Sequence, residues 1–292
     1  MGLSVLILTL NEEANLPECL ASISWSDDIV VLDSYSTDRT VEIARAAGAR
    51  VLQRKFDNWS CHQNWAVRHI EFKYPWVYYS DADERVTPEL AGEMVSIAGN
   101  GAGGPVAYRV RFKNIFMGRW IRHSSLYPTW ILRFFQPDRV HWERLVNPVA
   151  VVDGPEGRLQ GHFEHYSFSK GLGQWFAKHN LYSSDEAQEL IRTVEGPMDW
   201  QGLISRDPVK RRKAMKSLAY RMPLRPTLVF SYLYFIRLGL LDGMPGLTYC
   251  RLRAMFEYMV DLKVKELRRK ENGLVLGPQT MTTSQTTDAV HV

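Results

Sequence analysis

The chain has 292 residues, of which 45% are apolar and 12% aromatic, and its formal net charge is +4 at pH 7. A chain of this length and composition buries a core, which excludes a disordered protein and allows one large α/β domain with an appended segment or two modest domains. The three cysteines, Cys19, Cys61 and Cys250, are far apart, so the sequence indicates neither a disulfide framework nor a zinc site.

The N-terminal segment is an apolar run that stops at Asn11-Glu12-Glu13. It has neither the basic start nor the small-residue cleavage site that a signal peptide requires. Together with the isolated cysteines, this favours reduced thiols and a cytoplasmic location.

The first half of the chain alternates continuous apolar runs, typical of strands buried on both faces, with segments of helical periodicity. Strands are predicted over residues 4–10, 29–32, 50–53 and 76–79. Helices are predicted over residues 11–23, over a segment capped by 34–38 and ended by Gly48, over 60–70, and from the N-cap Thr87 onward. This order predicts a Rossmann-like α/β fold with a mostly parallel sheet flanked by helices.

The pattern changes after the Gly-rich turn near residue 100. Short mixed strands are predicted over residues 107–112 and 130–135, and a helical pattern begins at Gly171. The tail after Glu271 is rich in Thr, Ser and Gln and is predicted to be disordered. We therefore predict an α/β domain over residues 1–170, a helical extension over 171–272 and a disordered tail over 273–292.

The positive charge is concentrated in the C-terminal region. Residues 205–270 contain 16 Lys or Arg and 5 Asp or Glu, whereas the remainder contains 20 and 27. The basic segment 209–222 precedes the apolar, aromatic run 227–241, which is shorter than the ~20 residues that span a bilayer. Basic and aromatic side chains together favour the headgroup region of an anionic membrane. We predict a monotopic anchor here; a buried helix pair and an oligomer contact are the alternatives.

Polar side chains gather where the predicted strands end. Asn11 and Glu12 follow the first strand, Asp33 follows the second, and Asp81 and Asp83 follow the fourth. In an open parallel sheet, ligands bind at the carboxyl ends of the strands. Two carboxylates at the Asp-X-Asp spacing can share a divalent cation that binds a diphosphate. A solvated turn is the alternative for this motif taken alone.

Three runs of sequence carry a family resemblance: residues 4–13, residues 29–40 and the turn Asp81-Ala82-Asp83-Glu84. They resemble family 2 glycosyltransferases of the GT-A fold, and more narrowly the branch similar to lipopolysaccharide core β-1,4-glucosyltransferases. The strong part of the resemblance covers about the first 95 residues. A looser match continues through His165-Tyr166-Ser167 and Leu241-Asp242-Gly243.

The resemblance implies a GT-A domain that binds a nucleotide sugar, with UDP as the preferred nucleoside diphosphate. Its donor pocket would be formed by Thr9, Asn11, Glu12, Asp33, Asp81 and Ala82. In this assignment Thr9, Asn11 and Glu12 line the nucleoside pocket. Asp33 holds the base or the ribose, and Asp81 approaches the ribose and the metal.

The resemblance also implies a divalent metal, Mg²⁺ or Mn²⁺. Asp83 would be the principal ligand, with Asp81 beside it. Because the family tends to place a late histidine on the metal, His165 is the expected third ligand and His162 the second choice. A packing or surface role is the alternative for either histidine.

Family members carry an acidic general base after the acceptor loop, often as Glu-Asp. The corresponding run here, His141-Trp142-Glu143-Arg144, has a single carboxylate and departs from that pattern. Glu143 is therefore the candidate base, with Asp153 second, and a surface ion pair with Arg144 is the alternative.

The resemblance thus implies inverting hexosyl transfer from a nucleotide sugar to a lipid-linked or cell-envelope glycan, at the cytoplasmic face of the inner membrane. Arg119, Arg122 and His123 are candidates to bind phosphates of donor or acceptor, unless they form an ordinary solvated loop. Two other functions remain open: a nucleotidyltransferase, and a non-enzymatic protein whose basic region binds nucleic acid. The aromatic run beside the basic segment favours a lipid surface over nucleic acid.

Overall fold

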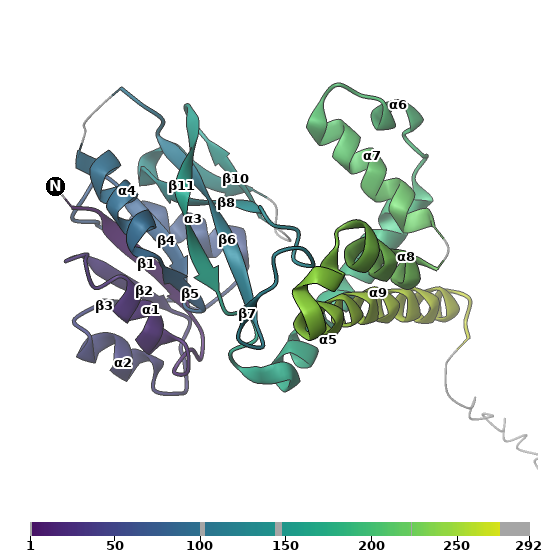
Figure 1. The fold of residues 1–292 in the computed structure, drawn as a ribbon, viewed down its shortest axis with the longest axis horizontal. Helices are drawn as coiled ribbons and strands as arrows, with labels where there is room; N and C mark the ends of the chain where they lie inside the picture. The colour runs from purple at the N-terminus through teal and green to yellow at the C-terminus, as the bar shows by residue number, and fades with distance from the viewer. Residues whose placement is uncertain (1, 100–102, 144–147, 223, 275–292) are drawn as a thin grey trace, which may run out of the picture. The chain divides into compact units, whose positions relative to one another are not determined.

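The computed structural model describes residues 2–99, 103–143, 148–222 and 224–274 (Figure 1). The chain forms two compact units, the first from Met1–Trp175 with Tyr232–Cys250, and the second from Phe176–Ser231 with the chain from Arg251 onward. The first segment of this unit ends at Trp175, whereas the sequence predicted a boundary at residue 170. The unit also includes Tyr232–Cys250, which we predicted to belong to the helical extension. Most of the predicted tail, from residue 275, lies outside the described residues.

The first unit is built on a mixed sheet with the strand order β3-β2-β1-β4-β8-β6-β11-β5 and with β7 paired to β6. Its first half holds the parallel strands β1 (Ser4–Thr9), β2 (Ile29–Asp33), β3 (Arg50–Gln53) and β4 (Val77–Asp81). These four strands confirm the prediction for the first half of the chain.

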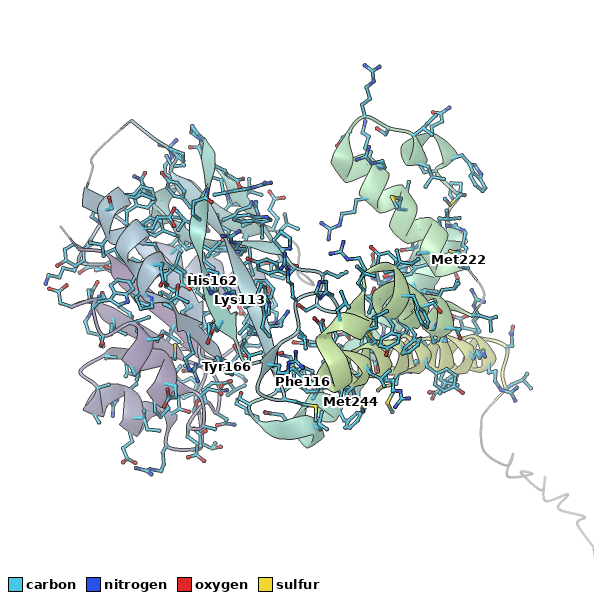
Figure 2. All side chains as sticks on the ribbon, viewed as in Figure 1. Lys113, Phe116, His162, Tyr166, Met222 and Met244 are labelled. Atoms are coloured by element: carbon cyan, nitrogen blue, oxygen red, sulfur yellow. The ribbon has the colours of Figure 1, made fainter. Side chains whose placement is uncertain are left out.

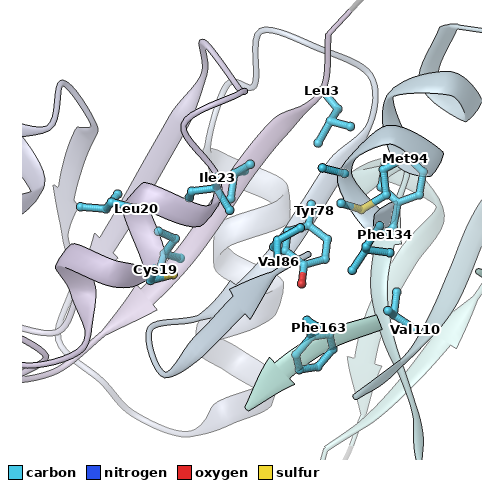
Figure 3. Packing of buried hydrophobic residues seen from close by; sticks show 14 of the residues in the cluster. Leu3, Cys19, Leu20, Ile23, Tyr78, Val86, Met94, Val110, Phe134 and Phe163 are labelled. Carbon is cyan, nitrogen blue, oxygen red and sulfur yellow. The ribbon is translucent and has the colours of Figure 1, made fainter. Parts of the chain in front are cut away.

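Alternation along the buried strands creates a core on each face of the sheet. In β1, Val5 and Ile7 belong to one hydrophobic cluster, and Leu6 and Leu8 belong to the other. Successive side chains of a strand point to opposite faces, so an uninterrupted apolar run requires helices on both sides. Figure 3 shows the first cluster, where Tyr78 and Phe134 pack beneath the helices.

Helices α1 (Leu16–Ser22), α2 (Thr40–Ala46) and α4 (Pro88–Gly99) supply the first cluster, and α3 (Trp59–His69) supplies the second (Figure 1). The helix predicted from residue 11 begins only at Leu16. Asn11 has a positive φ of 55°, a left-handed conformation that no α-helix continues, so a turn precedes α1.

The second half of the sheet is antiparallel in part. It contains β5 (Glu84–Val86), β6 (Ala107–Phe116), β7 (Arg119–Trp120), β8 (Trp130–Phe135) and β11 (Glu156–His165). A 3₁₀ turn (η1, Pro137–Arg139) leads into a separate two-stranded sheet of β9 (Val140–Glu143) and β10 (Val149–Val152). Of these strands, the sequence predicted only β8 fully and β6 in part.

The C-terminal half is helical, as expected from residue 171. It contains α5 (Gly171–Glu195), α6 (Trp200–Leu203), α7 (Pro208–Arg221), α8 (Arg225–Ser231), the π-helical turn η2 (Tyr232–Ile236), the 3₁₀ turn η3 (Gly239–Asp242) and α9 (Gly243–Glu271). In the second unit, Ala187, Leu190 and Ile191 of α5 pack against Val260 and Val264 of α9.

The apolar run 227–241 does not form one helix. It is divided among α8, η2 and η3, and Leu238 adopts a positive φ of 60° at the break. Within the described ranges, no single helix is both long and apolar enough to cross a bilayer. Only the pair Arg225–Ile236 and Gly239–Glu271, bent by 73°, meets that test when taken together.

Candidate active site

The loops after β1 and β2 are joined by hydrogen bonds between backbone and side chains. The Asn11 N–H donates to Ser36 Oγ at 2.8 Å, and Asn11 Oδ1 accepts from the Thr37 N–H at 2.8 Å. The Glu12 N–H donates to Thr40 Oγ1 at 2.7 Å. These contacts place Asn11 and Glu12 beside the segment that follows Asp33, as the sequence predicted for residues at neighbouring strand ends.

Asp33 lies at the end of β2 and is fully buried. Its carboxylate accepts from Thr9 Oγ1 at 3.1 Å, from the Ser36 N–H at 2.9 Å and from Gln53 Nε2 at 3.1 Å. The structure therefore brings Thr9 and Asp33 together as expected. In this state the carboxylate braces the loop and faces protein donors.

Glu12 is half-buried beside Lys170, which comes from the segment after β11. Lys170 Nζ donates to Glu12 Oε1 at 2.5 Å and to the Asn11 carbonyl at 2.6 Å. Burial raises the pKa of Glu12, and the hydrogen bonds from Lys170 and Asn15 oppose that rise. Lys170 thus contacts both Asn11 and Glu12, the two residues after β1 that the sequence predicted for the donor pocket.

Asp81 ends β4 and contacts a buried arginine. The Arg133 guanidinium, on β8, donates to the carboxylates of both Asp81 and Glu84, and its side chain is only 4% exposed. Tyr79 Oη also donates to Asp81 Oδ1, at 3.1 Å. Burial raises the pKa of Glu84, and the charge of Arg133 opposes it. The carboxylate of Asp81 is therefore held by protein groups.

Asp83 meets His165 at the edge of the sheet. β11 pairs with β5 so that His165 lies opposite Glu84, and His165 Nε2 is 3.3 Å from Asp83 Oδ2. The other ring nitrogen, Nδ1, is 2.9 Å from Asn114 Oδ1 on β6. Burial lowers the pKa of His165, but the hydrogen bond and charge of Asp83 outweigh burial, so its pKa is raised.

The Asp83 and His165 pair fits a divalent cation. Carboxylate oxygen and imidazole nitrogen are both ligands for Mn²⁺, and oxygen suits Mg²⁺. Donation from Nδ1 to Asn114 would keep Nε2 available as the ring nitrogen that binds a metal beside Asp83. Among the described residues, no three His, Cys, Asp or Glu side chains form a ready ligand cluster. Asp83 and His165 would thus supply two ligands to a bound cation, and the oxygens of a diphosphate would complete its coordination.

The candidate bases lie at the small sheet of β9 and β10. Glu143 is at the end of β9, its side chain is 63% exposed, and Oε1 is 3.4 Å from His141 Nε2. Asp153 is more exposed and faces Arg139. Arg144, the alternative ion-pair partner of Glu143, lies outside the described residues. His162 lies in β11, three residues before His165, and the charged groups near it are Lys113, Arg111, Glu164 and Glu89 rather than Asp83.

Comparison with known proteins bears on this site. The family model described as "Glycosyl transferase family 2" matches residues 4–154. A lipopolysaccharide core biosynthesis glycosyltransferase, LpsC of Rhizobium meliloti (strain 1021), is 32% identical over 272 residues, which cover 87% of this chain and 91% of the relative. A glycosyltransferase of Rickettsia typhi (strain ATCC VR-144 / Wilmington) is 24% identical over 94% of this chain and 90% of its own. Among solved structures, the mannosyltransferase PcManGT from Pyrobaculum calidifontis, in complex with GDP-Man and Mn²⁺, is 15% identical with a TM-score of 0.47, over 90% of this chain and 87% of that chain.

The family model covers more than half of the chain, and the similarity to LpsC runs over most of both proteins. The chain belongs to the family 2 glycosyltransferases. The protein is therefore a glycosyltransferase, an enzyme that transfers sugars. This assignment replaces the two alternatives left open by the sequence, a nucleotidyltransferase and a non-enzymatic nucleic-acid-binding protein. The mixed, mostly parallel sheet flanked by helices confirms the GT-A fold expected from the sequence.

Sequence reasoning missed several residues of this glycosyltransferase. Arg133 and Asn114 lie in ordinary strand patterns of β8 and β6, where only the strand pairing shows that they reach Asp81 and His165. His62 of α3 is buried, with Nε2 3.4 Å from Ser34 Oγ and Nδ1 2.8 Å from the Arg54 guanidinium. Burial and then Arg54 lower the pKa of His62. His62 therefore adjoins the loop that follows β2.

Proposed function

We propose that this glycosyltransferase is inverting and metal-dependent and moves a hexose from a UDP-sugar to a lipid-linked or cell-envelope glycan, such as lipopolysaccharide core. The observation that carries the proposal is the meeting of His165 with Asp83, which lies in the turn between β4 and β5. The 32% identity to LpsC, a lipopolysaccharide core biosynthesis enzyme, supports the acceptor class.

The donor would bind across the carboxyl ends of β1, β2 and β4. Thr9, Asn11 and Glu12 line this edge after β1, and Asp33 lies at the end of β2, one strand away. Asp81 and Ala82 start the turn that leads to Asp83. The nucleoside would lie over the first two loops, with its diphosphate at the turn.

The metal would be held by Asp83 and His165, with Asp81 close by. When bound, a divalent cation supplies Lewis-acid stabilisation of the negative charge that develops on the leaving diphosphate. Asn114 orients the His165 ring for that role. Most of the rate enhancement then comes from positioning and electrostatics, without a covalent enzyme intermediate.

In the proposed reaction, the acceptor hydroxyl oxygen forms a bond to the anomeric carbon on the face opposite the nucleoside diphosphate. The bond between the anomeric carbon and the diphosphate oxygen breaks, and its electron pair leaves with the diphosphate. A carboxylate oxygen of Glu143 takes the proton of the hydroxyl. The exposed side chain of Glu143 is open to an incoming acceptor.

We place the enzyme in the cytoplasm, peripherally bound at the cytoplasmic face of the inner membrane. α7 is strongly basic, and η2 exposes Tyr232, Phe235 and Ile236. Cations near an anionic bilayer contribute about 1 kcal/mol each, and aromatic side chains favour the headgroup region. This combination supports the anionic membrane surface as a partner beside a lipid-linked acceptor.

The experiment that tests the proposal is a calorimetric titration of the purified protein with a panel of nucleoside diphosphates and nucleotide sugars. The titrations are made with Mn²⁺ or Mg²⁺ and repeated with EDTA. We expect one nucleoside diphosphate to bind only when the metal is present, because the metal bridges its phosphates to Asp83 and His165. No binding of any member to a folded sample, or identical binding with EDTA, would contradict the donor assignment.

Replacement of Glu143 with glutamine is expected to reduce sugar transfer about 10²- to 10⁴-fold, the usual contribution of a general base. Binding of the nucleoside diphosphate should stay unchanged, because Glu143 lies on β9 rather than at the donor loops. Transfer is followed by release of nucleoside diphosphate, with Asp153→Asn as the matched variant. If Asp153→Asn is inactive and Glu143→Gln is active, the base is Asp153.

A further inference from the structure

A row of basic and aromatic side chains crosses one face of the second half of the sheet. On β6, Arg111 and Lys113 are two residues apart and therefore point to the same face. Arg111 lies opposite Trp130 on β8 and opposite His162 on β11. Residues directly opposite each other on paired strands share a face. Trp130, Arg111 and His162 thus form one continuous row across three strands.

Cations flank both tryptophans of this face. The guanidinium carbons of Arg158 and Arg111 lie 5.1 Å and 5.9 Å from the centre of the Trp130 ring. Lys113 Nζ lies 4.6 Å from the centre of the Trp120 ring, and the Arg122 guanidinium carbon lies 5.6 Å from it. We call this set the basic stripe; its members are Arg158, Trp130, Arg111, Lys113, Trp120 and Arg122.

The basic stripe carries more positive charge than its carboxylates offset. Arg109, on the same face, is paired with Glu156 at 2.7 Å. Two further carboxylates lie near Lys113 and His162: Glu164, which accepts a hydrogen bond from Tyr166 Oη at 2.7 Å, and Glu89. Burial and then Lys113 lower the pKa of His162, which lies next to Lys113 in Figure 2. The four cations of the basic stripe, Arg111, Lys113, Arg122 and Arg158, therefore outnumber the two carboxylates Glu89 and Glu164.

Two side-chain N–H groups of the basic stripe have no hydrogen-bond acceptor among the described residues. Arg111 Nε and Trp120 Nε1 are buried and have no hydrogen-bond partner within the described part of the chain. Buried donors are nearly always satisfied in folded proteins. A ligand rich in oxygen acceptors and negative charge would meet this requirement.

Asp242 holds the loop at one end of the basic stripe, where Arg122 lies. The Asp242 carboxylate, 4% exposed, accepts from the backbone N–H groups of His123 and Ser124 at 2.9 and 2.8 Å. These bonds fix the loop that carries Arg122. On the opposite face of β6, the next residue after Lys113 is Asn114, which orients His165. The strands that carry the basic stripe therefore also reach the proposed metal ligands.

We propose that the basic stripe binds the acceptor through phosphate groups carried on its sugars. This inference rests on the proposed function and names the chemical class of the acceptor. Arginine forks and lysine bind phosphate oxygens, and the indole rings offer flat apolar surface to sugar rings. Both tryptophans are half-buried between cations, and the exposed members of the stripe are the cations Arg122 and Arg158. A membrane-inserting face instead exposes its apolar residues, so we commit to a phosphorylated saccharide.

The test compares wild type with the double variant Arg122→Gln/Arg158→Gln, in which two exposed cations of the basic stripe lose their charge. The control is Arg45→Gln/Arg68→Gln, which removes two exposed cations from α2 and α3. The probe is a deacylated, phosphorylated lipopolysaccharide-core oligosaccharide, and the same oligosaccharide after removal of its phosphates. Affinity for each is measured by calorimetry, and nucleoside diphosphate binding is measured on the same samples.

We expect the phosphorylated oligosaccharide to bind wild type and the control equally, and the stripe variant about tenfold more weakly. Removal of the phosphates should weaken binding to wild type by a similar factor. Equal affinity for both forms of the oligosaccharide, or an equal loss in the control, would overturn the proposal.

Binding to vesicles that contain phosphatidylglycerol distinguishes a saccharide-binding stripe from a lipid-binding one. If the stripe variant loses vesicle binding and keeps oligosaccharide binding, the occupant is lipid and the proposal is wrong. Nucleoside diphosphate binding distinguishes failure of the stripe proposal from failure of the proposed function. If the nucleotide binds wild type but the oligosaccharide does not, only the stripe proposal fails; if no nucleotide binds, the proposed function fails.

Discussion

The Asp83→Asn variant is expected to lose sugar transfer by about 10³-fold or more and to lose metal-dependent binding of the nucleoside diphosphate. The amide keeps the size of the side chain but removes the negative charge that a divalent cation requires. Asp83 is the only one of the two aspartates in its turn whose carboxylate is paired with His165 in the described structure. Calorimetry with and without EDTA, and release of nucleoside diphosphate during transfer, measure both effects.

The matched control for this prediction is Asp27→Asn. Asp27 is an exposed carboxylate of the same unit, paired with Lys73 next to the amino ends of β2 and β4 and away from their carboxyl ends. It should retain both metal-dependent binding and transfer. If Asp83→Asn keeps wild-type transfer while its nucleotide binding still depends on metal, Asp83 is not the principal ligand.

The second large effect is expected from Arg133→Met. Arg133 stands between Asp81 and Glu84, and Glu84 is 2% exposed. Removing one partner of a buried ion pair leaves the other uncompensated, which lowers the free energy of unfolding by about 3–5 kcal/mol. Urea denaturation followed by circular dichroism measures this loss.

A double-mutant cycle distinguishes lost charge compensation from lost packing. Adding Glu84→Gln to Arg133→Met removes the stranded carboxylate, so the double variant should recover a large share of the lost stability. If the second substitution recovers nothing, Arg133 acts through its contacts with the Tyr79 and Phe163 rings instead. The single variant Arg39→Gln, in an exposed pair with Glu42, should change stability little.

The parallel half of the sheet could be predicted because its strands are buried on both faces. Short uninterrupted apolar runs such as β1 and β2 are typical of parallel strands that helices cover on both faces. Their ends also located Asn11, Asp33 and Asp83, since the carboxyl ends of parallel strands meet at one edge. The start of α1 could not be predicted, because the spacing of apolar residues does not indicate the left-handed backbone conformation of Asn11.

The mixed half of the sheet could not be predicted in the same way. β5 has three residues, and β11 alternates charged and small residues with few apolar ones. Its buried members, Leu159 and Phe163, make sense only when packed against α4 and β6. His165 was named by resemblance, but its neighbour Asn114 comes from a strand 51 residues away, so only the fold reveals it.

The discontinuous first unit has a consequence for how this protein can be divided and inherited. Its last piece, Tyr232–Cys250, follows a helical stretch that belongs to the second unit. Asp242 lies in that piece and braces the loop at His123 and Ser124. A truncation at Trp175 would therefore remove part of the unit it was meant to isolate. Phe176–Ser231 behaves as an insertion, so a single recombination crossover cannot exchange it without also replacing the closing segment.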